Sequence, residues 1–145
     1  MKKVQFKTTI NATKEKVWQV LWNDDTYRKW TSIFSEGSRA ETDWKEGSKV
    51  LFLNENGDGM FSMIAKSRPN EFMSFKHLGM VKNREEQPAT DETKSWEGAM
   101  ENYILNDSNG TTELTVEIDM AGDFEKYFEE TFPKALNMVK ELAEG

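Results

Sequence analysis

The sequence predicts a single α+β domain in which a curved antiparallel sheet of about six to seven strands wraps around one long C-terminal helix. Three observations lead to this prediction. Segments of alternating apolar and polar residues are separated by tight-turn sequences, as in strands joined by hairpins. Two short helical patterns follow the first strand, and the chain ends in a long amphipathic pattern. Because 145 residues are the length of one ordinary domain, residues 1–145 are taken as one unit.

The first elements are a strand and two short helices. Alternation over residues 4–10 predicts a half-buried strand. Thr13 offers a hydroxyl N-cap for the helix that follows it, and Asp24 or Asp25 can cap a second helix over residues 26–30. Two short helices directly after one strand are compatible with few folds.

The middle of the chain predicts antiparallel strands. The turn sequences, Asn56 to Gly59 and Pro69-Asn70, are too short to connect parallel strands. The strands expected around them are residues 48–53, 60–67 and 71–81, with residues 34–42 as a weaker candidate. Residues 82–94 are charged and lack apolar periodicity, so we expect a long loop there. A hairpin of strands 96–105 and 111–120 then turns at Asn109-Gly110.

The C-terminal segment predicts an amphipathic helix capped by Asp123. Its apolar positions recur at spacings of three and four: Phe124, Phe128, Phe132, Ala135, Val139 and Leu142. Pro133 lies inside this pattern. Because proline lacks an amide donor and clashes with the preceding turn, we expect a kink or break near residues 131–133.

Composition excludes several classes of function. A net charge of −7 argues against nucleic-acid binding, which needs clustered Lys and Arg. The absence of Cys excludes disulfides and thiolate metal sites, and a single His leaves no His-rich metal site. We see no cofactor motif, no membrane span and no signal peptide, so we expect a cytoplasmic protein without integral membrane association.

Several motifs follow one another in a characteristic order: Ile10-Asn11-Ala12, Val17-Trp18, Leu21, Tyr27-Arg28-Lys29-Trp30, Gly47, Thr111 to Val116, and Phe132-Pro133-Lys134-Ala135-Leu136. Together they resemble the SRPBCC (START-like, helix-grip) superfamily. Within it they are most similar to the C-terminal domain of the activator of the ninety-kilodalton heat-shock-protein ATPase. The resemblance covers essentially the whole chain, but family members usually carry Trp in place of Phe132, and the charged segment 82–94 is less typical. It implies a cavity between the sheet and the last helix, because one helix cannot fill a concave sheet.

The candidate residues for such a cavity are apolar side chains of the predicted strands and last helix, with one imidazole and one phenol: Phe52, Phe61, Met63, Phe75, His77, Trp96, Met100, Tyr103, Phe128 and Phe132. Each aromatic is also an ordinary core residue by pattern alone. His77 is expected on one strand face with Phe75 and Gly79, either as a ligand-facing acid/base or as a strand histidine bonded to a neighbour. Trp96 and Met100 share one face of their strand, so Glu97 and Glu101 are expected in water.

Three functions are therefore compatible with the sequence. The first is non-enzymatic binding of a small hydrophobic or amphipathic ligand, oriented by polar groups such as His77, Tyr103 or Ser62. The second, implied by the resemblance, is a protein-interaction module with a chaperone-like partner. The third is a cyclase- or aromatase-type enzyme, for which His77 is the only obvious acid/base and no nucleophile motif is present.

Overall fold

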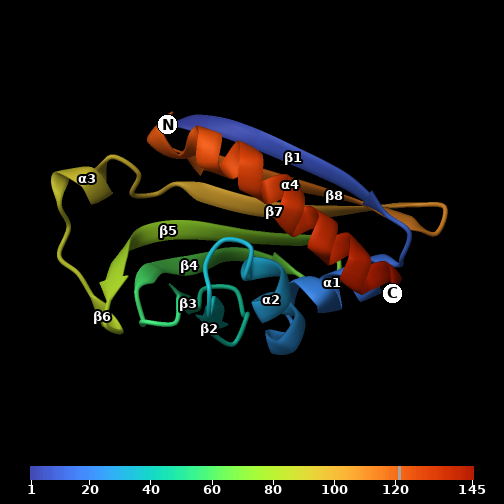
Figure 1. Cartoon of the computed structure of the whole chain (residues 1–145), viewed down its shortest axis with the longest axis horizontal. Helices are drawn as coiled ribbons and strands as arrows, with labels where there is room; N and C mark the ends of the chain where they lie inside the picture. The colour runs from blue at the N-terminus through green and yellow to red at the C-terminus, as the bar shows by residue number, and fades with distance from the viewer. Residues whose placement is uncertain (121) are drawn as a thin grey trace.

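The computed structural model describes the backbone of residues 1–120 and 122–145, and the side chains of all of these except 122 and 123. The elements it contains run in the order β1 (Lys2–Ile10), α1 (Lys14–Trp22), α2 (Asp24–Thr31), β2 (Arg39–Glu41), β3 (Lys49–Leu53), β4 (Gly59–Arg68), β5 (Phe72–Lys82), β6 (Glu85–Glu86), α3 (Asp91–Lys94), β7 (Met100–Ser108), β8 (Thr111–Met120) and α4 (Gly122–Glu144) (Figure 1). The predicted α+β architecture is confirmed.

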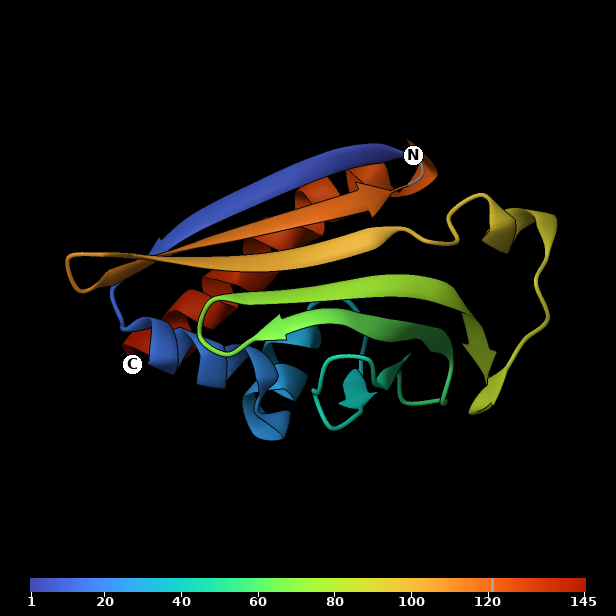
Figure 2. The ribbon, with the colours of Figure 1, turned by 180° about the vertical axis from the view of Figure 1, so that it is seen from behind.

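The strands form one curved, unclosed antiparallel sheet in the order β1-β8-β7-β5-β4-β3-β2, and β6 pairs with β5 beside this path (Figure 2). The described chain thus has eight strands, one more than the upper prediction, because β6 is a two-residue pairing with no sequence signature. The β7–β8 hairpin turns where predicted. Asn109 and Gly110 both have positive φ, +52° and +86°, as a two-residue hairpin turn requires.

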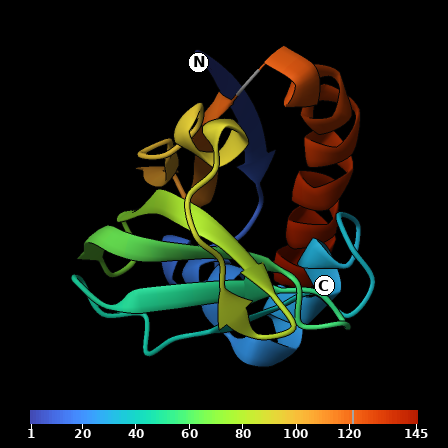
Figure 3. The same ribbon diagram turned by 90° about the vertical axis from the view of Figure 1, so that its left-hand side faces the viewer.

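Helices α1, α2 and α4 lie on the concave side of the sheet, whereas α3 lies beyond the ends of β5 and β7 (Figure 1). Figure 3 shows α4 running across this side while the strands curve around it. The described part of α4 contacts β1, α1 and α2. The two open edges of the sheet, β1 and β2, therefore both lie near helices.

Most local predictions for the helices are confirmed, with two differences. Thr13 caps α1, accepting a hydrogen bond from the Lys16 amide at 3.2 Å. The second helix begins at Asp24 and has Asn23 at the N-cap without a side-chain bond, so Asp24 and Asp25 lie in its first turn instead of capping it. Tyr27 and Trp30 are buried, as predicted.

Pro133 does not break α4, which continues through it to Glu144. Of the expected kink or break, the break is wrong, because the helix is held on both sides of the proline by buried residues, from Phe132 to Val139. Phe124, by contrast, is 48% exposed rather than part of the core face. The predicted cap at Asp123 lies outside the described side chains.

Three predicted segments differ in detail. The expected loop 82–94 contains β6 and the short helix α3, which a reciprocal Thr90–Thr93 capping box begins. The expected strand 96–105 begins only at Met100, because residues 95–98 form a turn after α3. The candidate strand 34–42 is reduced to the three residues of β2, and residues 34–38 form a loop.

Candidate functional site

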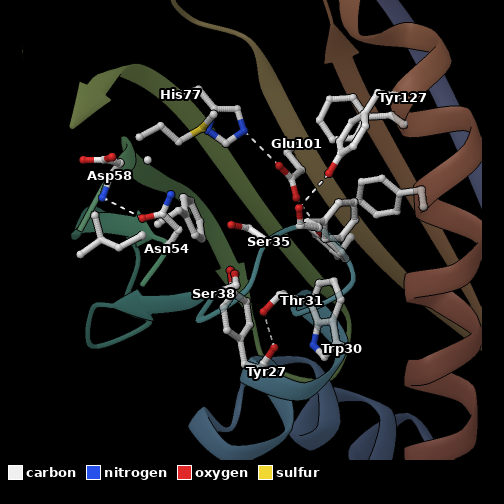
Figure 4. A pocket seen from close by; sticks show the side chains of 18 residues that line it. Tyr27, Trp30, Thr31, Ser35, Ser38, Asn54, Asp58, His77, Glu101 and Tyr127 are labelled. Atoms are coloured by element: carbon white, nitrogen blue, oxygen red, sulfur yellow. Dashed lines mark hydrogen bonds and ion pairs between the residues drawn. The ribbon is translucent and has the colours of Figure 1, made fainter. Parts of the chain in front are cut away.

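A cavity of about 310 Å³ lies between the sheet, the first half of α4 and the segment that runs from α2 to β2 (Figure 4). Its lining is dominated by aromatic and aliphatic side chains, with a few polar groups among them: Tyr27, Trp30, Thr31, Phe34, Ser35, Ser38, Phe52, Leu53, Asn54, Asp58, Gly59, Met60, His77, Glu101, Tyr103, Tyr127, Phe128 and Phe132.

The cavity exists because α4 packs closely along only part of its length. In its second half Ala135 and Val139 are fully buried against the core. In its first half Tyr127 remains 43% exposed, and its hydroxyl donates a 2.9 Å hydrogen bond to the backbone oxygen of Phe34. That bond joins α4 to the loop after α2, so the helix and the loop together form one wall of the cavity and the sheet forms the other.

The structure brings five of the ten sequence-predicted residues to the cavity wall: Phe52, His77, Tyr103, Phe128 and Phe132. Phe75 lies directly behind this wall. Its ring contacts Phe52 edge-to-face at 5.2 Å and it is almost fully buried, so its position is that of a core residue.

The other four candidates do not line the cavity. Phe61 and Met63 pair with β3 on the face that carries exposed Lys49, whose ammonium lies 5.7 Å from the Phe61 ring centroid. Met100 pairs with exposed Lys76, and Trp96 belongs to the turn after α3. Trp96 and Met100 were expected on one inner strand face, but β7 begins only at Met100, so that shared face does not form.

His77 is buried and joins three neighbouring strands through its two ring nitrogens. Its Nδ1 lies 2.6 Å from Ser62 Oγ on β4, and its Nε2 lies 3.0 Å from Glu101 Oε1 on β7. A neutral imidazole with its hydrogen on Nε2 satisfies both contacts, since the Ser62 hydroxyl then donates to Nδ1 and the ring donates to the carboxylate.

Of the two residues expected to share a strand face with His77, only one does. Phe75 shares that face, but Gly79 does not. A register shift places Gly79 opposite Phe61 whereas His77 is opposite Ser62. A side chain on Gly79 would meet the Phe61 ring at 2.5 Å, which places Gly79 on the outer face.

The position of Glu101 differs from the prediction, and this difference has the largest consequence for the site. Glu101 was expected in water, yet its side chain is only 22% exposed and lies in the cavity wall beside Tyr103. One carboxylate oxygen accepts from His77 Nε2, and the other accepts a short hydrogen bond from the Tyr103 hydroxyl. Figure 4 shows the imidazole directed at this carboxylate. Two donors therefore compensate the cost of placing an ionised carboxylate among aromatic rings.

The same carboxylate affects two buried phenols. Burial, followed by the charge of Glu101, raises the pKa of Tyr103 well above its ordinary value. Burial and that charge also raise the pKa of Tyr27. Both phenols accordingly keep their protons near neutral pH, and the Tyr103 hydroxyl donates its proton to Glu101.

Ser62, His77 and Glu101 together contain the residue types of a hydrolase triad, but their arrangement does not present a nucleophile. Ser62 is fully buried and is not part of the cavity lining, so a substrate in the cavity cannot reach its hydroxyl. His77 and Glu101 are the members that line the cavity. The network can therefore hold a carboxylate in place for binding or for proton transfer.

Sequence reasoning missed the lining contributed by α2 and the loop after it, from Tyr27 to Ser38. The burial of Tyr27 and Trp30 was predicted, but nothing in the pattern places that helix beside α4. The inward position of Glu101 was predictable from the sequence, because Tyr103 and Leu105 lie two and four residues further along the same strand, share its face and are buried.

A second cavity, also about 310 Å³, lies at the end of α1 and is lined by Trp18, Trp22 and Trp44 together with residues near the β4–β5 turn. The indole N–H of Trp22 is buried without a hydrogen-bond partner among the described residues. None of the described residues that line this cavity is charged, so among them there is no counterpart of Glu101 in the first cavity.

Among the described side chains no cluster of three or more His, Cys, Asp or Glu could hold a metal ion. None of the helices in the described part of the chain has the length and apolar character needed to cross a membrane.

Comparison with known proteins identifies the architecture. No protein-family profile matches the chain, and no curated protein matches it. Solved structures do match over nearly its full length. The solution structure of the Aha1 dimer from Colwellia psychrerythraea is 21% identical, with a TM-score of 0.72, and the match covers 99% of this chain and 97% of that one. This chain has the helix-grip fold.

Two further solved structures share this architecture. Protein MLL2253 from Mesorhizobium loti has a TM-score of 0.75 at 14% identity, and the match covers 97% of this chain and 96% of that one. CalU16 from Micromonospora echinospora has a TM-score of 0.68 at 12% identity, with 97% and 75% covered. The resemblance read from the sequence is thus confirmed at the level of the fold. Identities this low carry no information about the ligand.

Proposed function

We propose that the chain binds a small hydrophobic or amphipathic molecule in the cavity between α4 and the sheet, without chemical turnover. The observation that carries this proposal is the cavity itself, about 310 Å³, whose apolar wall contains the polar groups of Glu101, His77 and Tyr103. Ligand sites are typically concave and mostly apolar, with a few convergent polar groups, and begin at about 300 Å³.

The cavity wall has the chemistry of such a site. Phe34 contacts Phe132 at 4.9 Å and Phe128 at 6.2 Å between ring centroids, so the helix side of the cavity is a continuous aromatic surface. Burying a ligand against this surface releases water from apolar area, which supplies most of the binding free energy. Glu101, Tyr103 and His77 then orient the ligand.

Native mass spectrometry of protein purified from its own source, before and after organic extraction, tests this proposal. We expect an excess mass that extraction removes. A Ser38→Trp variant, which fills the cavity from the loop side, should lack this mass. Ser108→Trp, which places the same side chain on the exposed β7–β8 hairpin, should keep it. An apo mass throughout, together with no uptake of added hydrophobic probes, would contradict the proposal.

A second candidate is a proton-transfer enzyme of the cyclase or aromatase type. It is favoured by the position of Glu101, an ionisable group supported by two donors at the wall of an apolar cavity. The extracted ligand, returned to the protein in D₂O, would acquire deuterium with the wild-type chain and not with Glu101→Gln. Identical spectra for the two proteins would remove this candidate.

The third candidate, an interaction module with a chaperone-like partner, is supported by the likeness to an Aha1 structure. Its test is independent of the cavity. A chaperone partner should be retained from native extract by the wild-type chain and by Ser38→Trp alike. Loss of retention only in Ser38→Trp would contradict this candidate, because it would show that retention depends on the cavity.

A further inference from the structure

We infer that the ligand of the α4 cavity carries a hydrogen-bond donor of positive charge, an alkyl or arylalkyl amine, and that the carboxylate of Glu101 is its anchor. This inference rests on the proposed ligand-binding function and adds the chemical class of the ligand.

The first step is the balance of charge around the cavity. Among the described lining residues there are two carboxylates, Asp58 and Glu101, and neither Lys nor Arg. The nearby Arg39 directs one guanidinium nitrogen to the backbone oxygen of Asn54 at 2.8 Å and lies 3.6 Å from the Glu41 carboxylate. A ligand carboxylate or phosphate would therefore enter a site with like charge and no cationic partner.

The second step is the unused hydrogen-bonding capacity of Glu101. An ionised carboxylate has about four lone-pair sites. In this network one is used by His77 Nε2 and one by the Tyr103 hydroxyl. Since both neighbours donate and the remaining sites can only accept, a complementary ligand group must be a donor. Charge-assisted bonds of this kind are about twice as strong as neutral ones, and more so where water is excluded.

The third step is the aromatic wall that faces this carboxylate. Eight of the described lining residues carry aromatic rings other than imidazole: Tyr27, Trp30, Phe34, Phe52, Tyr103, Tyr127, Phe128 and Phe132. Aromatic faces attract cations and repel anions because of their quadrupole. An ammonium group at Glu101 is thus favoured both by the carboxylate and by the rings around it, while the apolar body of the ligand fills the rest of the cavity.

The experiment compares three probes with the same body, octylamine, 1-octanol and octanoate, by isothermal titration calorimetry at pH 7 and low salt. Octylamine is protonated at this pH, as is a lysine side chain. We expect octylamine to bind at least about tenfold more tightly than octanoate, the size of one charge-assisted hydrogen bond, with octanol between them.

Two variants locate the effect. Glu101→Gln should weaken octylamine binding about tenfold and change octanol binding less than threefold. Glu117→Gln makes the same change on β8, where Glu117 is bonded to Gln5 outside the cavity, and should bind like the wild type.

The outcomes separate the two proposals. If none of the probes binds the wild-type chain, the ligand-binding function itself fails. If octanoate binds as tightly as octylamine, binding stands and the assignment of an amine is overturned. Because this comparison needs only the wild-type chain, it remains decisive even if Glu101→Gln does not fold.

Discussion

The hydrogen bond from Tyr103 to Glu101 gives the sharpest prediction for stability. Tyr103 is almost fully buried, and its ring packs edge-to-face on Trp22 with centroids 5.0 Å apart. Tyr103→Phe keeps this packing and removes only the donor to the carboxylate. A hydrogen bond to a charged group contributes a net of about 1.5–3 kcal/mol, so we expect the free energy of unfolding to fall by about 2 kcal/mol.

A double-mutant cycle with Glu101→Ala isolates this bond, and Tyr27→Phe is its matched control. Tyr27 is also a buried phenol beside Glu101, but it makes no hydrogen bond to the carboxylate in the described structure. Urea unfolding, followed by tryptophan fluorescence, measures each variant. With a slope of about 2 kcal/mol per molar urea, Tyr103→Phe should lower the midpoint by about 1 M.

Comparing each tyrosine variant in the wild-type chain and in Glu101→Ala shows whether Tyr103 and Glu101 are energetically coupled. Tyr103→Phe should cost at least about 1 kcal/mol less once Glu101 is alanine, whereas the cost of Tyr27→Phe should stay within about 0.5 kcal/mol. Equal costs of Tyr103→Phe in both backgrounds would refute the coupling and leave only the loss of a buried hydroxyl.

Three further changes test other parts of the structure. Gly59→Ala would place a methyl group 1.8 Å from a carbonyl oxygen of β3, so we expect urea unfolding to show a loss of about 2–3 kcal/mol. Gly110→Ala has open space around the new methyl group and should lose only the ~1 kcal/mol that its positive φ costs. Equal losses would contradict the close approach at Gly59. Pro133→Ala restores an amide donor in the middle of α4 and should raise stability, by up to about 3 kcal/mol, so an unchanged midpoint would show that packing sets the backbone there. Arg84 holds the pKa of Glu41 below its ordinary value of 4.5, so as the pH falls the unfolded chain takes up this proton before the folded chain does. Stability should therefore decline from about pH 5 downward. Thermal unfolding of Glu41→Gln should show a shallower decline with pH, and a decline identical to that of the wild type would exclude this ion pair as a contributor.

Much of the fold was predictable because it is encoded locally. The hairpin at Asn109 follows from the backbone conformations that Asn and Gly tolerate, and the cap at Thr13 from its hydroxyl. Neither depends on distant residues. The break expected at Pro133 failed for the opposite reason, since tertiary packing on both sides outweighs the local penalty.

The cavity was only half predictable, because its wall depends on register. Met100 and Trp96 were placed inward by extending one strand through both, whereas the turn after α3 interrupts that strand. A shift of one residue moves every side chain to the other face, so the same error placed Glu101 in water. Gly79 was misplaced by a register shift that no spacing in the sequence reveals.

The open sheet has a consequence for behaviour at high concentration. A barrel has no free strand, but this sheet ends at β1 and at β2, and either edge could template another chain. The two edges differ in how they discourage this. β1 is long and carries the exposed lysines Lys3 and Lys7, so two such strands repel one another, while β2 is only three residues long. The open sheet that leaves room for a ligand thus has two edge strands, and strand addition is disfavoured by positive charge at β1 and by short length at β2.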